Sequence, residues 1–488
     1  MKKIILYASL FGAFSLAGCK KYLDKEPDNR TQIRTPEQIA QLLTSAYPQG
    51  SYILFTESMS DNAEDKGSGG TGYDFVDRIN RQSYLYEVVE SSPDDLDGPD
   101  FYWNSCYKAI AASNQAMEII EASINKDQLN PHKGEALVAR AYAHFMLVTL
   151  FSKAYDPATA ATDPGIPYVT APEKETFALY ERKTVAFVYE MIEKDLKEGL
   201  PLIDDKIYGT VPKFHFNKKA AAAFAARFYM FKRDYNSVVN YGGQALGGTA
   251  TESLRNWNTT LTSLQYYELQ AEYTKSTERG NLLLQEANSI WGRAYASLRY
   301  GLGQNVATDI LLSPNVSGWI YAYDLYGATP DVYNIPKFYE HFVRENLNAN
   351  SGEPYNTVPL FTGEEALLNR AEAYVRLNNP TAAINDMNAF ISKNIDDYNP
   401  ATDNVTQQKI MNYYGLAAAP AMIEAVLDFK RAFFLHEGLR WFDILRLKIP
   451  VVHTTRQGQR IELTPDDKRR ILQLPPLTKQ AGLEPNAR

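Results

Sequence analysis

Cysteine is scarce in this chain. There are two cysteines in 488 residues, Cys19 and Cys106. Two thiols cannot build the disulfide framework of a small secreted module. Cys106 falls within an apolar pattern of helical spacing, and unpaired cysteines in such patterns behave as small hydrophobic side chains. We therefore expect Cys106 to be a buried structural thiol.

An excess of basic residues is also missing. The 50 Lys and Arg residues are outnumbered by 58 Asp and Glu residues, which gives a net charge of −8. A nucleic-acid-binding protein needs a basic face to meet the phosphate backbone. The composition argues against a nucleic-acid partner.

The short motifs of the common catalytic sites are missing as well. The six histidines form no HExxH pair, and the chain contains no Walker A or GxSxG sequence. Nothing marks a pair of carboxylates for glycosidase chemistry, although such partners can lie far apart in a sequence. We expect a protein that is not an enzyme and that needs no cofactor.

An acidic loop provides oxygen ligands without a recognisable metal-binding pattern. Asp94, Asp95, Asp97 and Asp100 surround Gly98, but their spacing is not that of an EF-hand. A solvated acidic loop is the preferred interpretation, and a calcium site is the alternative.

Apolar runs are short everywhere, including at the start of the chain. The run from Ile4 to Leu16 follows two lysines and is shorter than the roughly 20 residues that span a bilayer. This pattern is typical of a secretory signal peptide. The sequence LAGC that ends at Cys19 resembles the lipobox of bacterial lipoproteins. That resemblance implies a signal peptide over residues 1–18, lipid attachment at Cys19 and a lipidated polar tether over residues 19–30; an ordinary signal peptide is the alternative.

Helical periodicity dominates the remainder of the chain. Thr35 and Pro36 provide an N-cap and a first helical residue for a short helix that ends near Tyr47. Two later segments each read as two helices joined by a tight turn and resemble tetratricopeptide helix pairs. The other predicted helices cover residues 101–122, 134–151, 184–200 and 419–447, and the predicted pairs cover residues 217–246 and 363–391.

Two intervals lack a sustained helical period. Residues 60–100 contain the sequences KGSGGTG and SSPDDLDGPD, which are typical of loops. Residues 247–362 are rich in Gly, Asn, Thr, Tyr and Trp. Irregular segments between regular elements often carry binding residues. We expect the functional surface in the second interval.

Tyrosine is abundant, with 33 residues, and one group stands outside the helical segments. An exposed aromatic ring with polar neighbours suits a sugar, which offers C–H faces and hydroxyl edges. If the sequence GWIYAYDLYG is a strand, alternation places three of its rings on one face and Asp324 on the other. The alternative is that this face packs onto the helices. The candidates are Trp319, Tyr321, Tyr323 and Tyr326.

Further ligand candidates are scattered over both irregular intervals. Trp257 has polar neighbours and is predicted to be an exposed tryptophan. Tyr73 and Asp74 follow a glycine-rich loop and could reach over a ligand. A ligand role and a turn role are equally open for Asp61 and Asn62. A structural role is the preferred interpretation of the last group, which comprises Trp291, Arg293 and Tyr300.

Six segments in the same order resemble the SusD/RagB outer-membrane lipoproteins of Bacteroidetes. The most specific is FKRAFFLHEGLRWFDILRLK at residues 429–448, which is similar to the E-G-x-R-W-F-D-L-x-R helix of that family. A departure lies at Tyr333, where the family commonly has Arg, and it leaves the alignment of the ligand face open. The remaining segments are KYLDKEP with TPEQIAQLLTSAY, ESMSDNAED, YWNSCYKAIAASNQAMEII with GEALVARAYAHFMLVTLF, EEALLNRAEAYVRL and LQLPPLTKQAGLEPN.

The resemblance implies a mostly α SusD-like fold with four tetratricopeptide-like helix pairs as scaffold, a loop-rich ligand-binding face and minor β structure. It implies a single domain over residues 31–488: an N-terminal helical half (31–246), an irregular ligand-face region (247–362) and a C-terminal helical half (363–488). It also implies an outer-membrane lipoprotein that faces the cell exterior.

The partner implied by the resemblance is a SusC-like TonB-dependent barrel that receives a nutrient, with a glycan oligomer preferred over a peptide. An adaptor lipoprotein of tetratricopeptide type and a secreted glycosidase are the alternatives.

Overall fold

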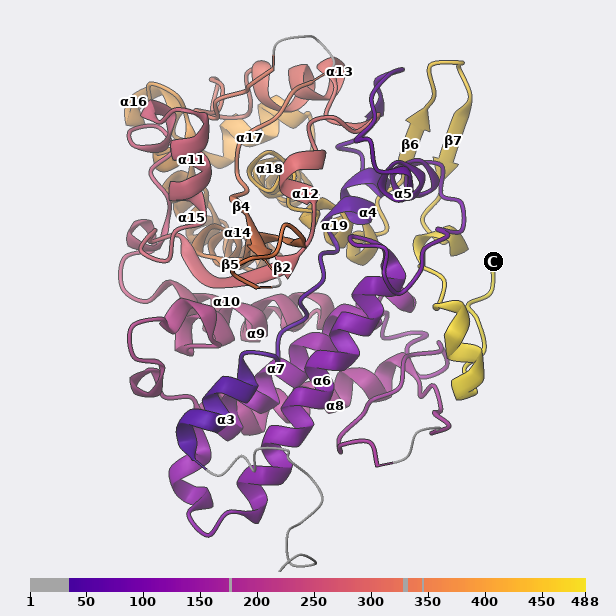
Figure 1. The fold of residues 1–488 in the computed structure, drawn as a ribbon. Helices are drawn as coiled ribbons and strands as arrows, with labels where there is room; N and C mark the ends of the chain where they lie inside the picture. Colours follow the sequence, from indigo (N-terminus) through magenta and orange to yellow (C-terminus); the bar gives the residue numbers. More distant parts are fainter. Residues whose placement is uncertain (1–34, 175–177, 328–331, 345) are drawn as a thin grey trace, which may run out of the picture.

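The computed structural model describes residues 35–174, 178–327, 332–344 and 346–488 (Figure 1). The predicted signal peptide, the tether and Cys19 lie outside these residues, so their predictions stay as they were made from the sequence.

The first layer of the fold is a set of helices that runs along the lower part of Figure 1. The Thr35 hydroxyl accepts a hydrogen bond from the backbone of Gln38, and the Gln38 side chain accepts one from the backbone of Thr35, which forms a capping box. The Thr184 hydroxyl caps another helix of this layer. The layer comprises α3 (Pro36–Leu43), α6 (Pro99–Ala122), α7 (Asn130–Phe151) and α8 (Val185–Gly199).

Helix α7 is the centre of this layer. Nearly all of its residues are buried between α6 and α8. This explains an apolar pattern that covers the whole circumference of the helix. Cys106 of α6 is buried, as predicted, and has no disulfide partner among the residues that the structure describes.

Two helix pairs follow and pack on each other. Asn217 and Asp234 cap the two helices of the first pair, and Arg233 between them has a left-handed φ of 64°. Helix α10 also packs along α14, which joins the two pairs. These are the tetratricopeptide-like pairs predicted from the sequence: α9 (Lys218–Lys232) with α10 (Tyr235–Leu246), and α14 (Gly363–Arg376) with α15 (Pro380–Asn394).

An antiparallel three-stranded sheet interrupts the interval between the pairs. Strand β5 (Gly352–Thr362) lies in the middle, between β2 (Asn281–Asn288) and β4 (Glu340–Arg344). In the described part of the chain β4 is an edge strand, since only β5 pairs with it. The interval is therefore less irregular than the sequence predicts, because buried Leu and Val side chains of β2 and β5 pack against the helices.

The single helix predicted over residues 419–447 is wrong. The chain forms α18 (Ala418–Phe433) and α19 (Leu439–Leu447), with a break at Gly438, where φ is 72°. The backbone N–H groups of His436 and Gly438 donate to the buried Glu57 carboxylate, at 2.8 Å and 3.0 Å, instead of continuing a helix. A buried long-range acceptor thus ends the helical run.

The prediction that residues 60–100 form only loops is also wrong. Helix α5 (Asp74–Tyr84) lies in this interval, shortly after α4 (Ile53–Met59). Val76 and Ile79 of α5 are fully buried. Burial of this apolar side stabilises a helix whose polar residues resemble a loop in the sequence.

The remaining elements are short. They are β1 (Glu64–Asp65), β3 (Tyr300–Gly301), β6 (Val451–Thr454), β7 (Arg460–Leu463), α11 (Tyr266–Tyr273), α12 (Trp291–Ala294), α13 (Gln304–Ala307), α16 (Pro400–Asp403) and α17 (Gln407–Tyr414). Among the described residues no single helix is long and apolar enough to cross a membrane; α17 and α18 together pass that test but meet at 83°.

Candidate functional site

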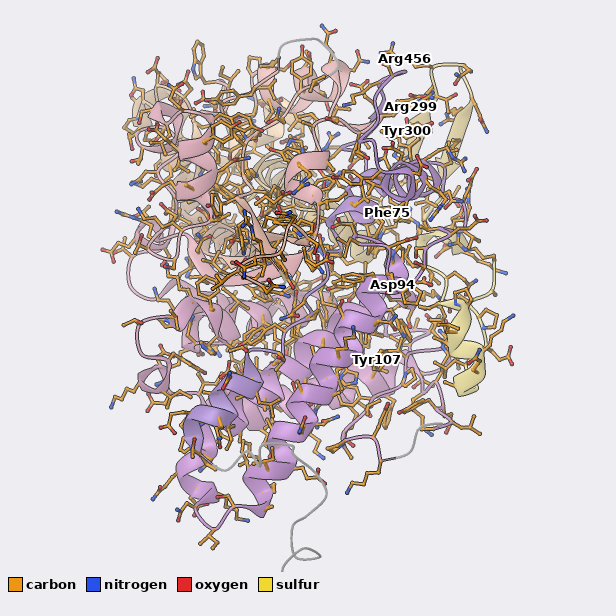
Figure 2. All side chains as sticks on the ribbon, in the orientation of Figure 1. Phe75, Asp94, Tyr107, Arg299, Tyr300 and Arg456 are labelled. Atoms are coloured by element: carbon orange, nitrogen blue, oxygen red, sulfur yellow. The ribbon has the colours of Figure 1, made fainter. Side chains whose placement is uncertain are left out.

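A cavity of about 580 Å³ lies where α5, the loop before α6, the end of β2, α12 and the β4–β5 strands meet. Its volume is in the range of sites that hold small molecules. Figure 2 shows two of its residues, Phe75 and Asp94, beside α5 and the start of α6. The cavity is lined by Tyr73, Phe75, Asp94, Leu96, Phe101, Asn288, Ile290, Arg293, Phe342, Gly352, Glu353 and Pro354.

The wall on the α5 side is fixed by a short hydrogen-bonded turn. The backbone N–H and the hydroxyl of Thr71 donate to the Asp77 carboxylate at 2.9 Å and 3.0 Å. The Thr71 hydroxyl in turn accepts from the backbone N–H of Tyr73 at 3.2 Å. The Tyr73 ring then meets the Phe75 ring edge-on, with 6.2 Å between centroids. Tyr73 is 38% exposed, so this ring is available to a ligand.

Arg293 connects the two walls of the cavity. Its Nε atom donates to both carboxylate oxygens of Glu340 on β4, at 2.7 Å and 3.0 Å. Its Nη1 atom donates to the Tyr73 hydroxyl at 3.3 Å. The hydrogen bonds to Glu340 raise the pKa of the Arg293 guanidinium. Arg293 therefore holds α12, β4 and the α5 loop together, and its charge is already matched by Glu340.

Asp97 anchors the acidic loop to the floor of the cavity. Its carboxylate accepts hydrogen bonds from the Ser289 hydroxyl at 2.5 Å and from the backbone N–H of Ile290 at 2.9 Å. Burial raises the pKa of Asp97 to about 6, although both hydrogen bonds act in the opposite direction. The loop that carries Asp94 and Leu96 is thus fixed against the end of β2.

The lining combines apolar rings with polar edges. Phe342 on β4 is 49% exposed, and Asp94 and Glu353 are exposed carboxylates at the same cavity. Rings beside hydrogen-bonding groups can contact the C–H faces and the hydroxyl groups of a sugar. The cavity carries more negative than positive charge, because Glu340 already pairs with Arg293.

The acidic loop does not gather its carboxylates at one point. Asp95 pairs with Arg78 at 2.9 Å, and Asp97 bonds to Ser289 and Ile290 as described above. Burial raises the pKa of Asp100 to about 6. Among the residues that the structure describes, no group of three or more His, Cys, Asp or Glu side chains is placed to hold a metal ion.

Of the candidates predicted from the sequence, the cavity brings together Tyr73 and Arg293. Asp74 is exposed at the start of α5, directly after Tyr73. The other candidates do not line this cavity.

The prediction that Trp257 is exposed is wrong. The side chain is 1% exposed, and its ring packs on Tyr323 with 4.8 Å between centroids. Two of its polar neighbours find partners inside the protein: Arg255 pairs with Glu364 at 2.9 Å, and the Asn258 amide donates to two backbone carbonyls. Polar flanks therefore gave a false signal of exposure.

The sequence GWIYAYDLYG is not a regular strand and forms only isolated bridges. Tyr321 and Tyr323 stack on each other with 5.2 Å between centroids, and both are buried. The Tyr323 hydroxyl donates to Asn394 of α15 at 3.0 Å. Tyr321 and Tyr323 therefore follow the alternative interpretation of the sequence, in which the aromatic face packs onto the helices. Tyr326 is half-buried and packs edge-on against Tyr266.

Trp319 is the exposed ring of that group, at 49%. It follows a turn in which the Asn315 backbone N–H donates to the Trp319 carbonyl at 3.0 Å. Trp319 does not line the cavity, so it remains a separate candidate platform on another part of the surface.

Two further candidates, Trp291 and Tyr300, have structural partners. The Trp291 indole is buried and donates to the His436 carbonyl at 3.1 Å, in agreement with the preferred structural interpretation. Tyr300 is buried and stacks on Tyr84 with 4.4 Å between centroids. Figure 2 shows Tyr300 near the upper end of the view, beside Arg299.

Asp61 and Asn62 connect the loop after α4 to the C-terminal helices. The Arg440 guanidinium donates to both Asp61 oxygens at 2.8 Å. The Asn62 side-chain oxygen accepts from Arg431 at 3.1 Å, and Asn62 is buried. Neither residue is left free for a ligand at the cavity.

Sequence reasoning missed the other rings of the cavity. Phe75, Phe101 and Phe342 come from three different elements. Phe75 lies in the interval that the sequence predicts to be loops, and Phe101 lies at the start of a predicted helix, where an aromatic ring indicates packing. No sequence signal marked Phe342, because its exposure and that of Val343 follow from the position of β4 at the edge of the sheet.

The observed architecture is a mostly α scaffold of helix pairs with a cavity on its loop-rich side. The family model SusD-like_3, described as "Starch-binding associating with outer membrane", matches residues 21–230. No match was found among the curated proteins. The family model supports the SusD/RagB resemblance over residues 21–230, which is less than half of the chain, and the solved structures below show the fold.

Solved structures show the same fold over almost the whole chain. A SusD superfamily protein from Bacteroides thetaiotaomicron has a TM-score of 0.65 and 18% identity, and the match covers 93% of this chain and 100% of that chain. A SusD superfamily protein from Bacteroides fragilis has a TM-score of 0.67 and 19% identity, and the match covers 93% of this chain and 99% of that chain. A SusD-like carbohydrate-binding protein from Bacteroides vulgatus has a TM-score of 0.63 and 16% identity, and the match covers 92% of this chain and 96% of that chain.

Proposed function

We propose that this protein is an outer-membrane lipoprotein that binds a glycan oligomer and delivers it to a SusC-like TonB-dependent barrel. The cavity formed by α5, α12 and the β4–β5 strands is the observation that carries the proposal. Support also comes from the family description, which names starch and the outer membrane, and from the carbohydrate-binding relative of the same fold. The lipid anchor at Cys19 and the outward orientation belong to this proposal.

The charges of the cavity favour a neutral glycan over an acidic one. Asp94 and Glu353 are exposed carboxylates at the lining, and the one guanidinium of the lining, that of Arg293, is paired with Glu340. A uronic acid would bring a further negative charge beside two carboxylates, which weakens binding. Neutral sugar rings can stack on Tyr73 and Phe342 and donate hydroxyl hydrogens to the carboxylates.

A peptide is the second candidate because of the edge strand β4. Phe342 lines the cavity from β4, and among the described residues β4 pairs on one side only. An extended peptide could add to that edge through backbone hydrogen bonds while a side chain entered the cavity.

Calorimetric titration of the purified protein against three pools tests the ligand class. The pools are neutral oligosaccharides, oligogalacturonates and short peptides. We expect saturable binding of a neutral oligosaccharide, with weaker or no binding of the acidic pool. Binding of the peptide pool alone would contradict the glycan proposal and favour the edge-strand alternative.

Variants of the cavity then test the site. Phe342→Ala and Tyr73→Ala should each weaken glycan binding by about 1 to 3 kcal/mol, because each removes a ring from the contact surface. Tyr267→Ala is the matched control, since Tyr267 is 80% exposed and lies outside the cavity. If glycan affinity were unchanged in both cavity variants but reduced in Trp319→Ala, the binding site would lie at the Trp319 surface and not in the cavity.

The transport partner is tested by copurification from detergent-solubilised outer membranes. The proposal expects a β-barrel protein in stoichiometric amount with the lipoprotein. A clean preparation of the lipoprotein without a barrel would contradict the partner, although glycan binding itself would stand.

A further inference from the structure

The three-stranded sheet carries a row of aromatic rings on β4 and β5 (Figure 1). Tyr339 lies directly before β4, and its carbonyl extends the ladder by accepting from the backbone N–H of Thr357 on β5 at 3.2 Å. Tyr339 and His341 share a face of the sheet because they are two residues apart, and Tyr355 of β5 lies opposite His341. The His341 ring centroid is 6.3 Å from that of Tyr339 and 6.0 Å from that of Tyr355, at interplanar angles of 22° and 23°. The three rings therefore form one row across two strands.

The row is open to solvent and has unused polar groups. Tyr339 is 47% exposed, the side chain of His341 is 35% exposed, and Tyr355 is half-buried. Neither tyrosine hydroxyl has a hydrogen-bond partner among the residues that the structure describes. A contiguous exposed patch of this kind marks a surface that contacts a ligand or a partner.

The middle ring of the row is held in place from the neighbouring strands. His341 Nε2 lies 3.2 Å from Glu286 Oε2 on β2. The other oxygen of Glu286 accepts from the Thr357 hydroxyl of β5 at 2.8 Å. A ring that is already fixed loses little freedom when a ligand binds, which favours affinity.

The row begins at the edge of the cavity that carries the proposed function. Asn288 of β2 lies opposite Tyr355, and Glu353 precedes Tyr355 by two residues on β5, so both share the face of that ring. Asn288 and Glu353 also line the cavity. A chain that leaves the cavity at this edge meets Tyr355 first and Tyr339 last.

The groups around the row fit a glycan better than a protein surface. The carboxylates of Glu286 and Glu353 and the hydroxyl of Thr357 stand on the same face of the sheet as the rings. Carboxylates are depleted at the centre of protein interfaces, whereas they accept hydrogen bonds readily from the hydroxyl groups of a sugar. The rings provide the apolar surface that the C–H faces of a sugar need.

We propose that Tyr339, His341 and Tyr355 form an extension of the glycan site, which binds the part of an oligosaccharide that projects from the cavity. The proposal rests on the proposed function, because the cavity has to hold the end of the same chain. Two linked contacts on one ligand reinforce each other through a high effective concentration. The protein therefore selects oligosaccharides long enough to occupy both the cavity and the row.

Calorimetry of the full protein with short and long sugars tests this selection. The probes are the disaccharide and the hexasaccharide of four neutral series: maltose and maltohexaose, and the matching cello-, xylo- and manno-oligosaccharides. In the series that binds, the hexasaccharide should bind at least about tenfold more tightly than the disaccharide. Equal affinities would overturn the extension and leave the cavity as the glycan site. Absence of binding by all of these sugars would overturn the proposed function and the extension together.

Variants of the row locate the extension. Tyr339→Ala and Tyr355→Ala should each weaken hexasaccharide binding by about fivefold or more and leave disaccharide binding unchanged, because only the longer sugar reaches the row. Phe342→Ala, in the cavity, should weaken both sugars. Tyr267→Ala, an exposed tyrosine outside both the row and the cavity, is the control and should change neither.

Two results would contradict the extension even if the glycan binds. Wild-type affinity for the hexasaccharide in both row variants would show that the rings do not contact it. An equal loss for both sugars in Tyr339→Ala would show that the substitution acts through the cavity. Melting temperatures close to that of the wild type, as expected for an exposed side chain, serve as the check on folding.

Discussion

At the scale of single residues, Glu57 shows how a buried carboxylate can fix a distant backbone. It accepts hydrogen bonds from the backbone of His436 and Gly438, which lie 379 and 381 residues further along the chain. Burial raises the pKa of Glu57 to about 7, although these hydrogen bonds act in the opposite direction. Protonation of this group is therefore coupled to folding.

Stability should consequently depend on pH through Glu57. The folded protein binds the proton up to about pH 7, whereas an unfolded glutamate releases it near its ordinary value of 4.5. Stability from this group is full below about pH 4.5 and is lost as the pH rises toward 7, at up to about 1.4 kcal/mol for each pH unit. Urea unfolding of the wild type and of Glu57→Gln, measured across this range, checks the slope.

Glu57→Gln is the reference because an amide does not titrate. The free energy of unfolding of the wild type should fall relative to that of the variant as the pH rises through the window. A difference between the two that stays constant from pH 4.5 to 7 would show that Glu57 has an ordinary pKa in the folded protein.

The residues of the cavity could be predicted only where a local sequence pattern indicates an exposed side chain. Tyr73 follows a glycine-rich loop, and this local signal was sufficient to select it as a candidate ligand-binding residue. The prediction that Trp257 is exposed was wrong because its polar neighbours Arg255 and Asn258 bond to partners that lie more than 100 residues away in the sequence. Phe342 was missed because its exposure depends on β4 being an edge strand, which no local pattern indicates.

At the scale of elements, the segment most typical of the family joins the C-terminal half to the rest of the fold. Arg440 of α19 pairs with Asp61, and Lys430 of α18 pairs with Asp443 of α19 at 2.7 Å. Arg446 pairs with Asp443 at 2.7 Å and with Glu372 of α14 at 2.5 Å. The motif has a structural role, because these charged groups are largely buried and are paired with one another or with Asp61 and Glu372 of other elements.

Removal of Arg446 should be strongly destabilising. Arg446→Ala leaves Glu372 and Asp443 buried with less compensation, and loss of one member of a buried ion pair costs about 3 to 5 kcal/mol. Chemical denaturation monitored by circular dichroism measures the change. Arg376→Ala is a matched control, because Arg376 also pairs with Glu372, at 3.1 Å, but has 31% of its side chain exposed.

The control variant should lose less than about 1 kcal/mol, as exposed ion pairs do. Similar losses in the two variants would contradict the structural role assigned to burial of the motif.

The helices themselves were largely predictable, because capping residues and apolar spacing are local. Thr35, Thr184 and Asn217 each cap the helix that the sequence predicts at that place. The break at Gly438 and helix α5 were not predicted, since both depend on tertiary contacts: the Glu57 carboxylate for the break, and burial of Val76 and Ile79 for α5.

At the scale of the whole molecule, the cavity that carries the proposed glycan site lies on a mostly helical scaffold. It combines Tyr73 and Phe342 with the exposed carboxylates of Asp94 and Glu353. The scaffold resembles SusD superfamily structures over more than nine-tenths of the chain, at identities below one-fifth. Relatives so distant share the fold, so the ligand has to be inferred from the cavities of this chain.

The most direct test of the central claim is a crystal structure of the protein soaked with the oligosaccharide that binds best in the titration. The account predicts sugar density in the cavity between α5, α12 and β4, with a sugar ring against Tyr73 or Phe342 and a hydroxyl within hydrogen-bond distance of Asp94 or Glu353. Sugar density at the Trp319 surface, with this cavity empty, would contradict it.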